Sequence, residues 1–186
     1  MIISIKKILK SCFYFIIILI MFYNISYSAD TMPHSITKIK KETQLKLIPN
    51  ISFTNLDNEI LNLTKVEKNN ILILNFWALW CAPCVKEMPI LQKLSNKLNN
   101  SIILFINQDS SKDNKKVKEF IEEIGISKNV VLTDFNMQSN KHFLLRGIPT
   151  TLIIDKQGKV KWRIEGVIDW TDENLIGWLK KGANEN

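Results

Sequence analysis

The fold is decided by one stretch of the chain, which reads Ile71-Leu72-Ile73-Leu74-Asn75-Phe76-Trp77-Ala78-Leu79-Trp80-Cys81-Ala82-Pro83-Cys84. Its first eight residues are almost wholly apolar, which is typical of a central strand buried on both faces. A helical pattern follows from Pro83, because apolar side chains then recur at the spacing of one helix face. The stretch therefore predicts a buried strand that runs into a helix, with two cysteines at the junction.

These two cysteines have the placement that thiol–disulfide exchange requires. The unpaired N–H groups and positive dipole end of a helix N-terminus favour a thiolate, and cysteine pKa values there fall to roughly 3.5–7.5. The two-residue spacer leaves the second thiol within bonding reach, and Pro83 suits the first helical turn. We expect Cys81 to attack a substrate disulfide, Cys84 to resolve the mixed disulfide, and Trp80 to shield the site.

Two other uses of the cysteine pair fit the sequence less well. A structural zinc site needs four ligands, and only Cys12, His34 and His142 remain, none of them at ligand spacing. A structural disulfide that closes so short a loop would add little stability. We therefore expect a redox-active disulfide between Cys81 and Cys84, with no metal and no other cofactor.

The rest of the chain alternates strands and helices. Apolar patterns predict strands at 71–78, 102–107, 130–133, 150–155 and 160–165, and helices from Pro83 (kinked at Pro89), at 117–124, at 137–145 and from a cap at Thr171. The alternating segment Pro49–Leu63, broken by an Asx-rich turn, predicts a β-hairpin before them. This order predicts an α/β fold: a central mixed β-sheet flanked by helices, with an added N-terminal hairpin.

A second element of interest is Gly147-Ile148-Pro149-Thr150, directly before a predicted strand. A proline there can be cis, and a cis X–Pro bond is held for a purpose; an ordinary trans proline at a strand start is the alternative. If the backbone before Pro149 faces Cys81, it can pair with an extended substrate chain. We therefore assign substrate binding to Trp80, Pro83, Ile148 and Pro149.

The N-terminus has the features of a targeting segment. Lys6, Lys7 and Lys10 precede an apolar run of 12 residues, and small residues at 26–28 suit a cleavage site. Twelve residues fall short of the roughly 20 that cross a membrane, which favours cleavage over an uncleaved anchor. We expect a signal peptide or anchor at 1–28, a linker at 29–44, a folded domain at 45–182 and a tail at 183–186. The domain is then periplasmic or otherwise extracytoplasmic, soluble or tethered to the inner membrane.

Charge and composition exclude some classes of partner. The net charge of +7 falls to +4 without residues 1–28, because three lysines lie there. No basic stripe with interleaved aromatic residues occurs, which argues against nucleic-acid binding. The contents of 46% hydrophobic and 23% charged residues are those of a globular domain, so we expect one folded unit.

The motifs together resemble the thioredoxin superfamily. The residues that carry the resemblance are Phe76-Trp77-Ala78, Trp80-Cys81, Pro83-Cys84, Pro89 and Gly147-Ile148-Pro149-Thr150. Within that superfamily, Cys84-Val85-Lys86-Glu87-Met88-Pro89, the preceding hairpin and the leader resemble the exported TlpA/ResA group. The resemblance implies a thioredoxin-like fold, a cis Ile148–Pro149 bond and thiol–disulfide oxidoreductase activity. It further implies reduction of apocytochrome c or of copper-site proteins of respiratory oxidases, with electrons from a membrane thiol donor. We expect the protein to be a monomer.

The chain departs from thioredoxins proper at one buried position. Thioredoxins carry an aspartate in the strand before the motif, where this chain has Asn75, which does not titrate. Glu87, one helical turn after Cys84, resembles the acidic residue that the TlpA/ResA group has near its active site. We therefore expect Glu87 to be catalytic by moving protons or tuning the thiols, the alternative being a solvated helix glutamate.

Two competing functions use the same residues. An oxidant or isomerase has the same motif and the opposite direction of electron flow, which follows from the difference in reduction potential. A Cu(I)-binding assembly factor would use Cys81, Cys84 and His142, although a helix-packing or surface histidine is the more ordinary interpretation. Arg146 is expected to be solvated, and Trp170, in a turn after Asp169, to be exposed.

Overall fold

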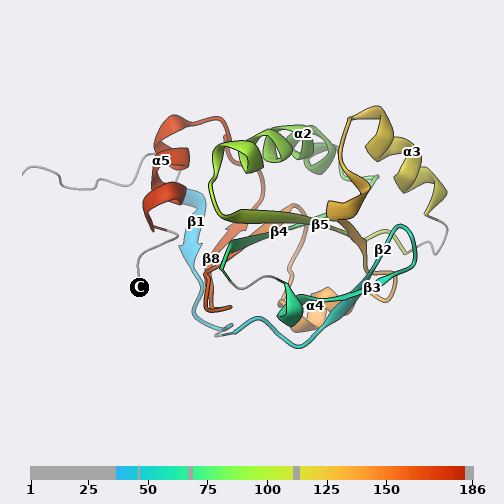
Figure 1. Ribbon diagram of the computed structural model, residues 1–186, viewed down its shortest axis with the longest axis horizontal. Coiled ribbons are helices and arrows are strands. Elements are labelled where there is room, and N and C mark those ends of the chain that lie inside the picture. Colours follow the sequence, from blue (N-terminus) through green and yellow to red (C-terminus); the bar gives the residue numbers. More distant parts are fainter. Residues whose placement is uncertain (1–36, 46, 67–68, 111–113, 183–186) are drawn as a thin grey trace, which may run out of the picture. The chain divides into compact units, whose positions relative to one another are not determined.

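A computed structural model describes residues 37–182 of the chain, except 46, 67–68 and 111–113 (Figure 1). The predicted leader at 1–28, the first part of the predicted linker and the predicted tail at 183–186 lie outside the described residues. Among the helices that the structure describes, none is long and apolar enough to cross a membrane.

A mixed eight-stranded sheet forms the centre of the domain. In spatial order its strands are β1 (Ile39–Lys41), β8 (Val160–Glu165), β7 (Thr150–Ile154), β4 (Ile71–Trp77), β5 (Ser101–Asn107), β6 (Val131–Thr133), β2 (Ser52–Asn55) and β3 (Ile60–Asn62). The neighbours β4, β5 and β6 are parallel, and the other neighbouring pairs are antiparallel. The predicted α/β class with a central mixed sheet is therefore confirmed.

Helices cover both faces of this sheet. They are α2 (Ala82–Lys97), α3 (Lys115–Glu123), α4 (Gln138–His142) and α5 (Glu173–Gly182), with short 3₁₀ turns η2 (Leu63–Lys65) and η3 (Lys128–Val130). In Figure 1, α2 and α3 lie on one side of the sheet and α4 on the other. Leu175 of α5 belongs to the same apolar cluster as Leu91 of α2, so α5 also covers the α2 side.

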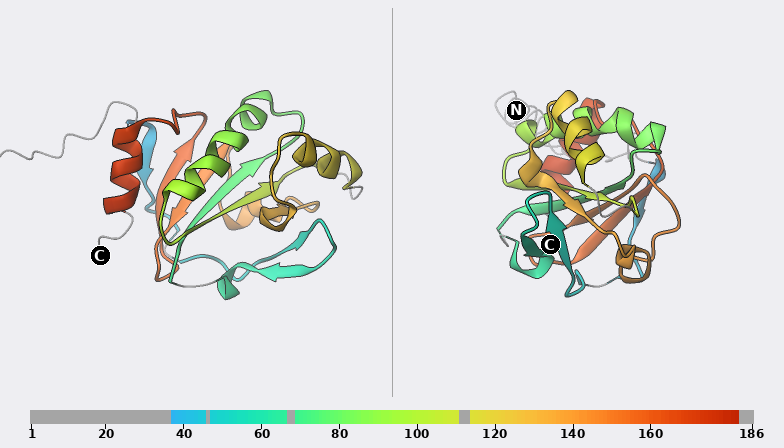
Figure 2. Two further views of the ribbon diagram at one scale, coloured as in Figure 1. Left: turned by 45° about the horizontal axis from the view of Figure 1, so that its top comes forward. Right: turned by 90° about the vertical axis from the view of Figure 1, so that its right-hand side faces the viewer.

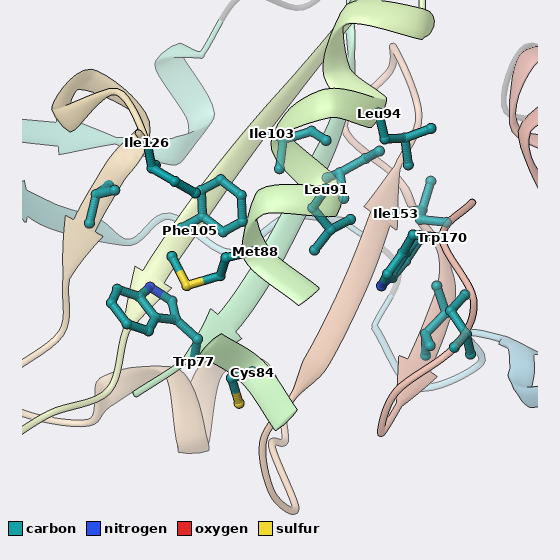
Figure 3. Packing of buried hydrophobic residues seen from close by; sticks show 14 of the residues in the cluster. Trp77, Cys84, Met88, Leu91, Leu94, Ile103, Phe105, Ile126, Ile153 and Trp170 are labelled. Carbon is teal, nitrogen blue, oxygen red and sulfur yellow. The ribbon is translucent and has the colours of Figure 1, made fainter. Parts of the chain in front are cut away.

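The central strand β4 is buried along its whole length, as predicted, and its side chains alternate between two separate apolar clusters. The side toward α2 carries Ile71, Ile73 and Trp77, whereas the opposite side carries Leu72, Leu74 and Phe76. Figure 3 shows Trp77 packed beside Met88 and Phe105 beneath α2. Burial on both faces holds the end of β4 firmly, and the cysteine pair follows that end.

The predicted N-terminal hairpin is confirmed as β2 and β3. The Asn55 side chain accepts hydrogen bonds from the backbone of Asp57 and Glu59, and Asn58 takes the left-handed conformation at φ +66°. The hairpin extends the sheet beyond β6, where Thr54 pairs with Thr133. It thus lies at the opposite edge of the sheet from β1 (Figure 2).

The linker predicted at 29–44 was wrong for its last part, because Ile39–Lys41 forms β1 and pairs with β8. Only Ile39 of this short strand is buried, so the segment has too few apolar residues to show a period. Directly after β1, the Glu42 carboxylate accepts a hydrogen bond from Arg163 of β8 over 2.6 Å.

Two predicted helix boundaries also differ from the structure. The helix predicted at 137–145 is shorter, because Met137 and Leu144 take the left-handed conformation on either side of α4. The cap of α5 is Asp172 and not Thr171: the Asp172 carboxylate accepts from the Asn174 backbone over 2.8 Å. The hydroxyl of Thr171 instead donates to the Asp169 carboxylate, within the turn that precedes α5.

Candidate active site

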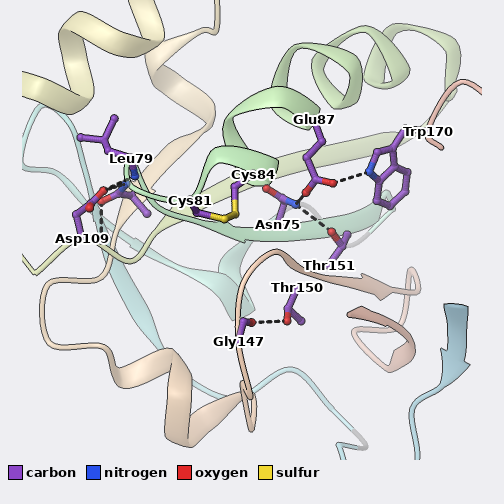
Figure 4. Close-up of a disulfide and its surroundings, with 11 residues drawn as sticks. Asn75, Leu79, Cys81, Cys84, Glu87, Asp109, Gly147, Thr150, Thr151 and Trp170 are labelled. Atoms are coloured by element: carbon purple, nitrogen blue, oxygen red, sulfur yellow. Dashed lines mark hydrogen bonds between the residues drawn. A yellow bond between two sulfur atoms is a disulfide. The ribbon is translucent and has the colours of Figure 1, made fainter. Parts of the chain in front are cut away.

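The two cysteines lie at the junction of β4 and α2, as the sequence predicts. Cys81 is the N-cap residue of α2, and a disulfide joins it to Cys84 with a Cα–Cα distance of 5.3 Å (Figure 4). The side chain of Cys84 is fully buried, whereas Cys81 keeps 5% of its surface exposed. Pro83 lies in the first turn of the helix. Cys84 is thus the more buried of the two sulfurs, as expected from the sequence, and Cys81 is the outer one.

The turn that presents Cys81 is held from two sides. The Cys81 backbone N–H donates to the Ala78 carbonyl over 3.1 Å, which closes the turn after β4. The Leu79 backbone N–H donates to the Asp109 carboxylate over 2.9 Å, and the Asn107 amide donates to the same oxygen over 2.7 Å. Asp109 therefore fixes the approach to the cysteines, a role that sequence reasoning missed. Its position just past the carboxyl end of β5, parallel to β4, was the available signal.

Glu87 is buried on α2, with 2% of its surface exposed. Its two carboxylate oxygens accept separate hydrogen bonds, one from the Asn75 amide over 2.8 Å and one from the Trp170 indole over 3.1 Å (Figure 4). Burial raises the pKa of the Glu87 carboxyl above its ordinary value, and these two hydrogen bonds offset only part of the rise. Glu87 is thus not the solvated glutamate that the sequence left open.

Trp170 was expected to be exposed, and the structure overturns that expectation. Its side chain is 2% exposed and belongs to the apolar cluster beneath α2. The segment between β8 and α5 returns to the sheet, so that the indole covers Glu87 and donates to it. A buried carboxylate needs donors, and the indole supplies one together with a large apolar surface.

Asn75 stands beneath the same part of α2. It is fully buried on β4 between Ile73 and Trp77, and its amide nitrogen donates to Glu87 and also to the Thr151 hydroxyl over 3.0 Å. Asn75, Glu87, Thr151 and Trp170 form one buried polar cluster, in which Asn75 and Trp170 donate to the carboxyl group and Thr151 accepts from Asn75.

The loop before β7 contains a cis Ile148–Pro149 bond, as the sequence resemblance implied. Its geometry is fixed by two hydrogen bonds: the Thr150 hydroxyl donates to the Gly147 carbonyl over 2.7 Å, and the Gly166 N–H donates to the Pro149 carbonyl over 2.8 Å. Pro149 is buried and Ile148 is half-buried. The carbonyl of Pro149 is therefore already committed within the fold.

A shallow groove runs beside this loop. Its lining includes Trp80, Gln108, Met137, Asn140, Arg146 and Ile148. Trp80 is 70% exposed, so it stands at the rim and does not close over the cysteines as expected. The exposed Arg146 guanidinium forms a forked pair with Glu165 at 2.6 and 2.7 Å, which ties the loop to β8.

The structure does not assemble the copper site considered from the sequence. His142 is exposed at the end of α4. Among the described residues, no group of three or more His, Cys, Asp and Glu side chains is placed to hold a metal ion. The cysteine pair and His142 are therefore not brought together.

A strand–turn–helix that presents a CxxC disulfide beside a cis-proline loop defines a thiol–disulfide oxidoreductase of thioredoxin-like fold. Residues 43–177 match the family described as Redoxin, and the chain belongs to that family. It is 34% identical over 143 residues to the thiol-disulfide oxidoreductase ResA of Bacillus thuringiensis (strain Al Hakam), covering 76% of this chain and 80% of the relative. It is also 31% identical over 121 residues to the thioredoxin-like protein YneN of Bacillus subtilis, covering 61% and 66% of the two chains.

Solved structures share the fold at lower identity. A secreted thiol-disulfide isomerase from Corynebacterium glutamicum matches with a TM-score of 0.64 at 21% identity, covering 86% of this chain and 96% of that one. StoA from Bacillus subtilis matches with a TM-score of 0.55 at 22% identity, covering 70% and 98%. At these identities the likenesses show the shared fold alone.

Proposed function

We propose that this protein is an exported dithiol reductant of protein disulfides. The observation that supports it most directly is the cysteine pair itself: an outer Cys81 at the N-terminus of α2, bonded to a fully buried Cys84. A partner disulfide can reach only the outer sulfur, so the inner one is reserved for the second step. The proposed substrates are apocytochrome c or copper-site proteins of respiratory oxidases, in keeping with the resemblance to the TlpA/ResA group.

The proposed cycle moves two electrons from the dithiol to the substrate. The Cys81 thiolate attacks one sulfur of the substrate disulfide, that S–S bond breaks, and the first substrate thiolate leaves. Cys84 then loses its proton and attacks the sulfur of Cys81, which releases the second substrate thiolate and closes the Cys81–Cys84 bond. A membrane thiol donor returns two electrons for the next turnover.

Export and a membrane donor are proposed together. The basic and apolar leader at 1–28 supports delivery across the inner membrane, with or without cleavage. Outside the cytoplasm a free dithiol tends to oxidise, so a reductant there needs a dedicated electron source. A donor in the same membrane satisfies that need.

Glu87 is proposed to handle the proton that Cys84 must lose. It lies three residues after Cys84 on α2, and both side chains are buried on the side that packs against β4. Burial raises the pKa of Glu87, so this carboxyl exchanges its proton at higher pH than an exposed glutamate does.

Partner recognition is proposed for the groove beside the cis-proline loop. Exposed Trp80 and half-buried Ile148 offer apolar surface next to Cys81. Because the Pro149 carbonyl already accepts from Gly166, backbone pairing with a partner falls to the residues before the proline. Pro83, exposed in the first turn of α2, is proposed to contact the partner from the other side.

The reduction potential of the Cys81–Cys84 pair tests the direction of electron flow. The protein is equilibrated with glutathione buffers of known potential and its free thiols are counted after alkylation; a variant with both residues changed to serine gives the blank for Cys12. A value near about −270 mV, as in thioredoxin, supports a reductant. A value near about −120 mV contradicts the proposal and supports an oxidant.

A further inference from the structure

One polar atom of the buried cluster beneath α2 has no hydrogen-bond partner in the part of the chain that the structure describes. It is the amide oxygen of Asn75, in a side chain that is fully buried. Buried acceptors without a partner are rare because each one has lost its bonds to water. The structure shows the cysteine pair oxidised, so this acceptor is open while the disulfide is closed.

The orientation of this amide is fixed by its other atom. The nitrogen of Asn75 donates both of its hydrogens, to the Glu87 carboxylate over 2.8 Å and to the Thr151 hydroxyl over 3.0 Å. Turning the amide over would place its oxygen against the ionised Glu87 carboxylate and would remove the Asn75 donor from it. The unpartnered oxygen must consequently lie on the far side from Glu87.

That far side is where Cys84 lies. Asn75 is on the face of β4 that packs against α2, between Ile73 and Trp77, and both of these belong to the same cluster as Cys84. Cys84 and Glu87 lie one helical turn apart on α2, and the Asn75 amide faces this turn from β4. In Figure 4 the nitrogen of Asn75 points to Glu87 and Thr151, and its oxygen points toward Cys84.

We propose that the amide oxygen of Asn75 accepts a hydrogen bond from the thiol of Cys84 whenever the disulfide is open. Opening by a donor dithiol breaks the Cys81–Cys84 bond, adds two electrons to the pair and leaves one proton on Cys84. A thiol can donate through its S–H, whereas a disulfide sulfur has no hydrogen to donate. The acceptor is therefore empty in the oxidised protein and filled in the reduced one.

This contact assigns the two sulfurs different protonation states. Two thiolates side by side would repel, so one of them must hold a proton. The Asn75 oxygen gives that proton a partner at Cys84 and leaves the negative charge on Cys81 at the helix N-terminus, where it is favoured. The inference concerns the reduced pair itself and holds for either direction of electron flow.

Infrared spectroscopy of the S–H stretch tests the contact directly, because hydrogen bonding lowers that frequency. In the 186-residue chain, a Cys81→Ala variant leaves the Cys84 thiol reduced, and subtracting the spectrum of C81A/C84A removes the band of Cys12. We expect the Cys84 band to move to higher frequency when Asn75→Leu is added. Thr151→Val is the matched control: it removes a partner of the amide nitrogen but keeps the oxygen, so the band stays low.

A second readout is the equilibrium with glutathione in protein that has both cysteines. Asn75→Leu removes an open acceptor from the oxidised state and a hydrogen bond from the reduced state. We expect the equilibrium to move about fivefold toward the disulfide, the size of one neutral hydrogen bond. If Asn75→Leu fails to fold, Asn75→Asp keeps an oxygen toward Cys84 and the band must stay low. An S–H band unmoved by Asn75→Leu, or moved equally by Thr151→Val, or raised by Asn75→Asp, overturns the proposal.

Discussion

Two glutamates of this protein whose side chains are buried lie in opposite electrostatic surroundings. Glu87, beneath α2, accepts only from uncharged donors, the amide of Asn75 and the indole of Trp170. Glu42, after β1, accepts from two backbone N–H groups and from the Arg163 guanidinium. Burial taken alone would raise the pKa of both carboxyls. At Glu42 the backbone bond from Gln44 and the contacts with Arg163 outweigh burial, and the pKa falls below its ordinary value; at Glu87 it stays above.

The difference shows that burial alone does not decide what a carboxyl group does. A guanidinium at 2.6 Å fixes Glu42 as an anion, so this pair is a structural link between the β1 segment and β8. Among the residues that the structure describes, no charged donor reaches Glu87, and burial raises the pKa of its carboxyl. The proton-transfer role proposed for Glu87 needs a carboxyl that can hold a proton, and the raised pKa of Glu87 is in keeping with it.

The largest expected effect comes from removing the cation. Arg163→Met leaves Glu42 buried without its charged partner and also frees the Phe143 carbonyl, which Arg163 binds over 2.8 Å. We expect a loss of about 3–5 kcal/mol in the free energy of unfolding, measured by urea titration. The double variant E42Q/R163M should lose clearly less, because no uncompensated charge stays buried. Equal losses of unfolding free energy in the two variants would mean that an unpaired Glu42 charge adds no cost, which contradicts this prediction.

The next largest effect is on the rate of thiol–disulfide exchange. Glu87→Gln removes the group proposed to take the proton of Cys84, and we expect exchange with a protein disulfide to slow by about 100-fold near neutral pH. The matched control is Glu42→Gln, which should lower stability and leave the exchange rate unchanged. Titration of the Cys81 thiolate provides a second measurement, since identical curves for wild type and Glu87→Gln would end the proton-transfer hypothesis.

A smaller effect is expected from the indole that holds Glu87. Trp170→Phe keeps the ring and removes the N–H donor, so the ionised carboxylate loses a partner. We expect a loss of about 1–2 kcal/mol in alkaline buffer and a smaller one in acid, where Glu87 is protonated. Trp178→Phe, a half-buried tryptophan that packs on Trp162, serves as the control and should show no such pH dependence.

The smallest effect is the slope of stability against pH, and its sign differs between the two glutamates. The lowered pKa of Glu42 stabilises the fold above the unfolded value of about 4.3, and this contribution is lost as pH falls. The raised pKa of Glu87 stabilises the fold below about 4.3, and this contribution is lost as pH rises through the folded value. Relative to wild type, Glu42→Gln should therefore lose most at high pH and Glu87→Gln at low pH. Parallel slopes for the two variants in urea titrations would contradict the comparison.

The sequence was sufficient for those parts of the molecule that local pattern determines. The continuous apolar run at 71–78 predicted β4, and two cysteines at a strand–helix junction predicted the disulfide that joins Cys81 and Cys84. The hairpin followed from alternation around Asn55 and its turn. In each case the residues that make the feature are close together in the chain.

The parts that were missed depend on contacts between distant residues. Trp170 binds Glu87 across 83 positions, and a tryptophan after a polar turn gives no local sign of burial. Asp109 binds the Leu79 backbone across 30 positions, because parallel β4 and β5 bring their carboxyl ends together. β1 has a single buried residue, Ile39, which is too little for a periodic pattern. Only the fold shows these partners.

The exposed indole of Trp80 gives this protein an optical reporter in its own active site. All five tryptophans of the chain lie in the part that the structure describes, and the other four are buried or half-buried. A water-soluble quencher will therefore act mainly on the fluorescence of Trp80, one residue from Cys81. Protection from that quencher measures the occupancy of the groove by any partner, without a label and without waiting for electrons to move.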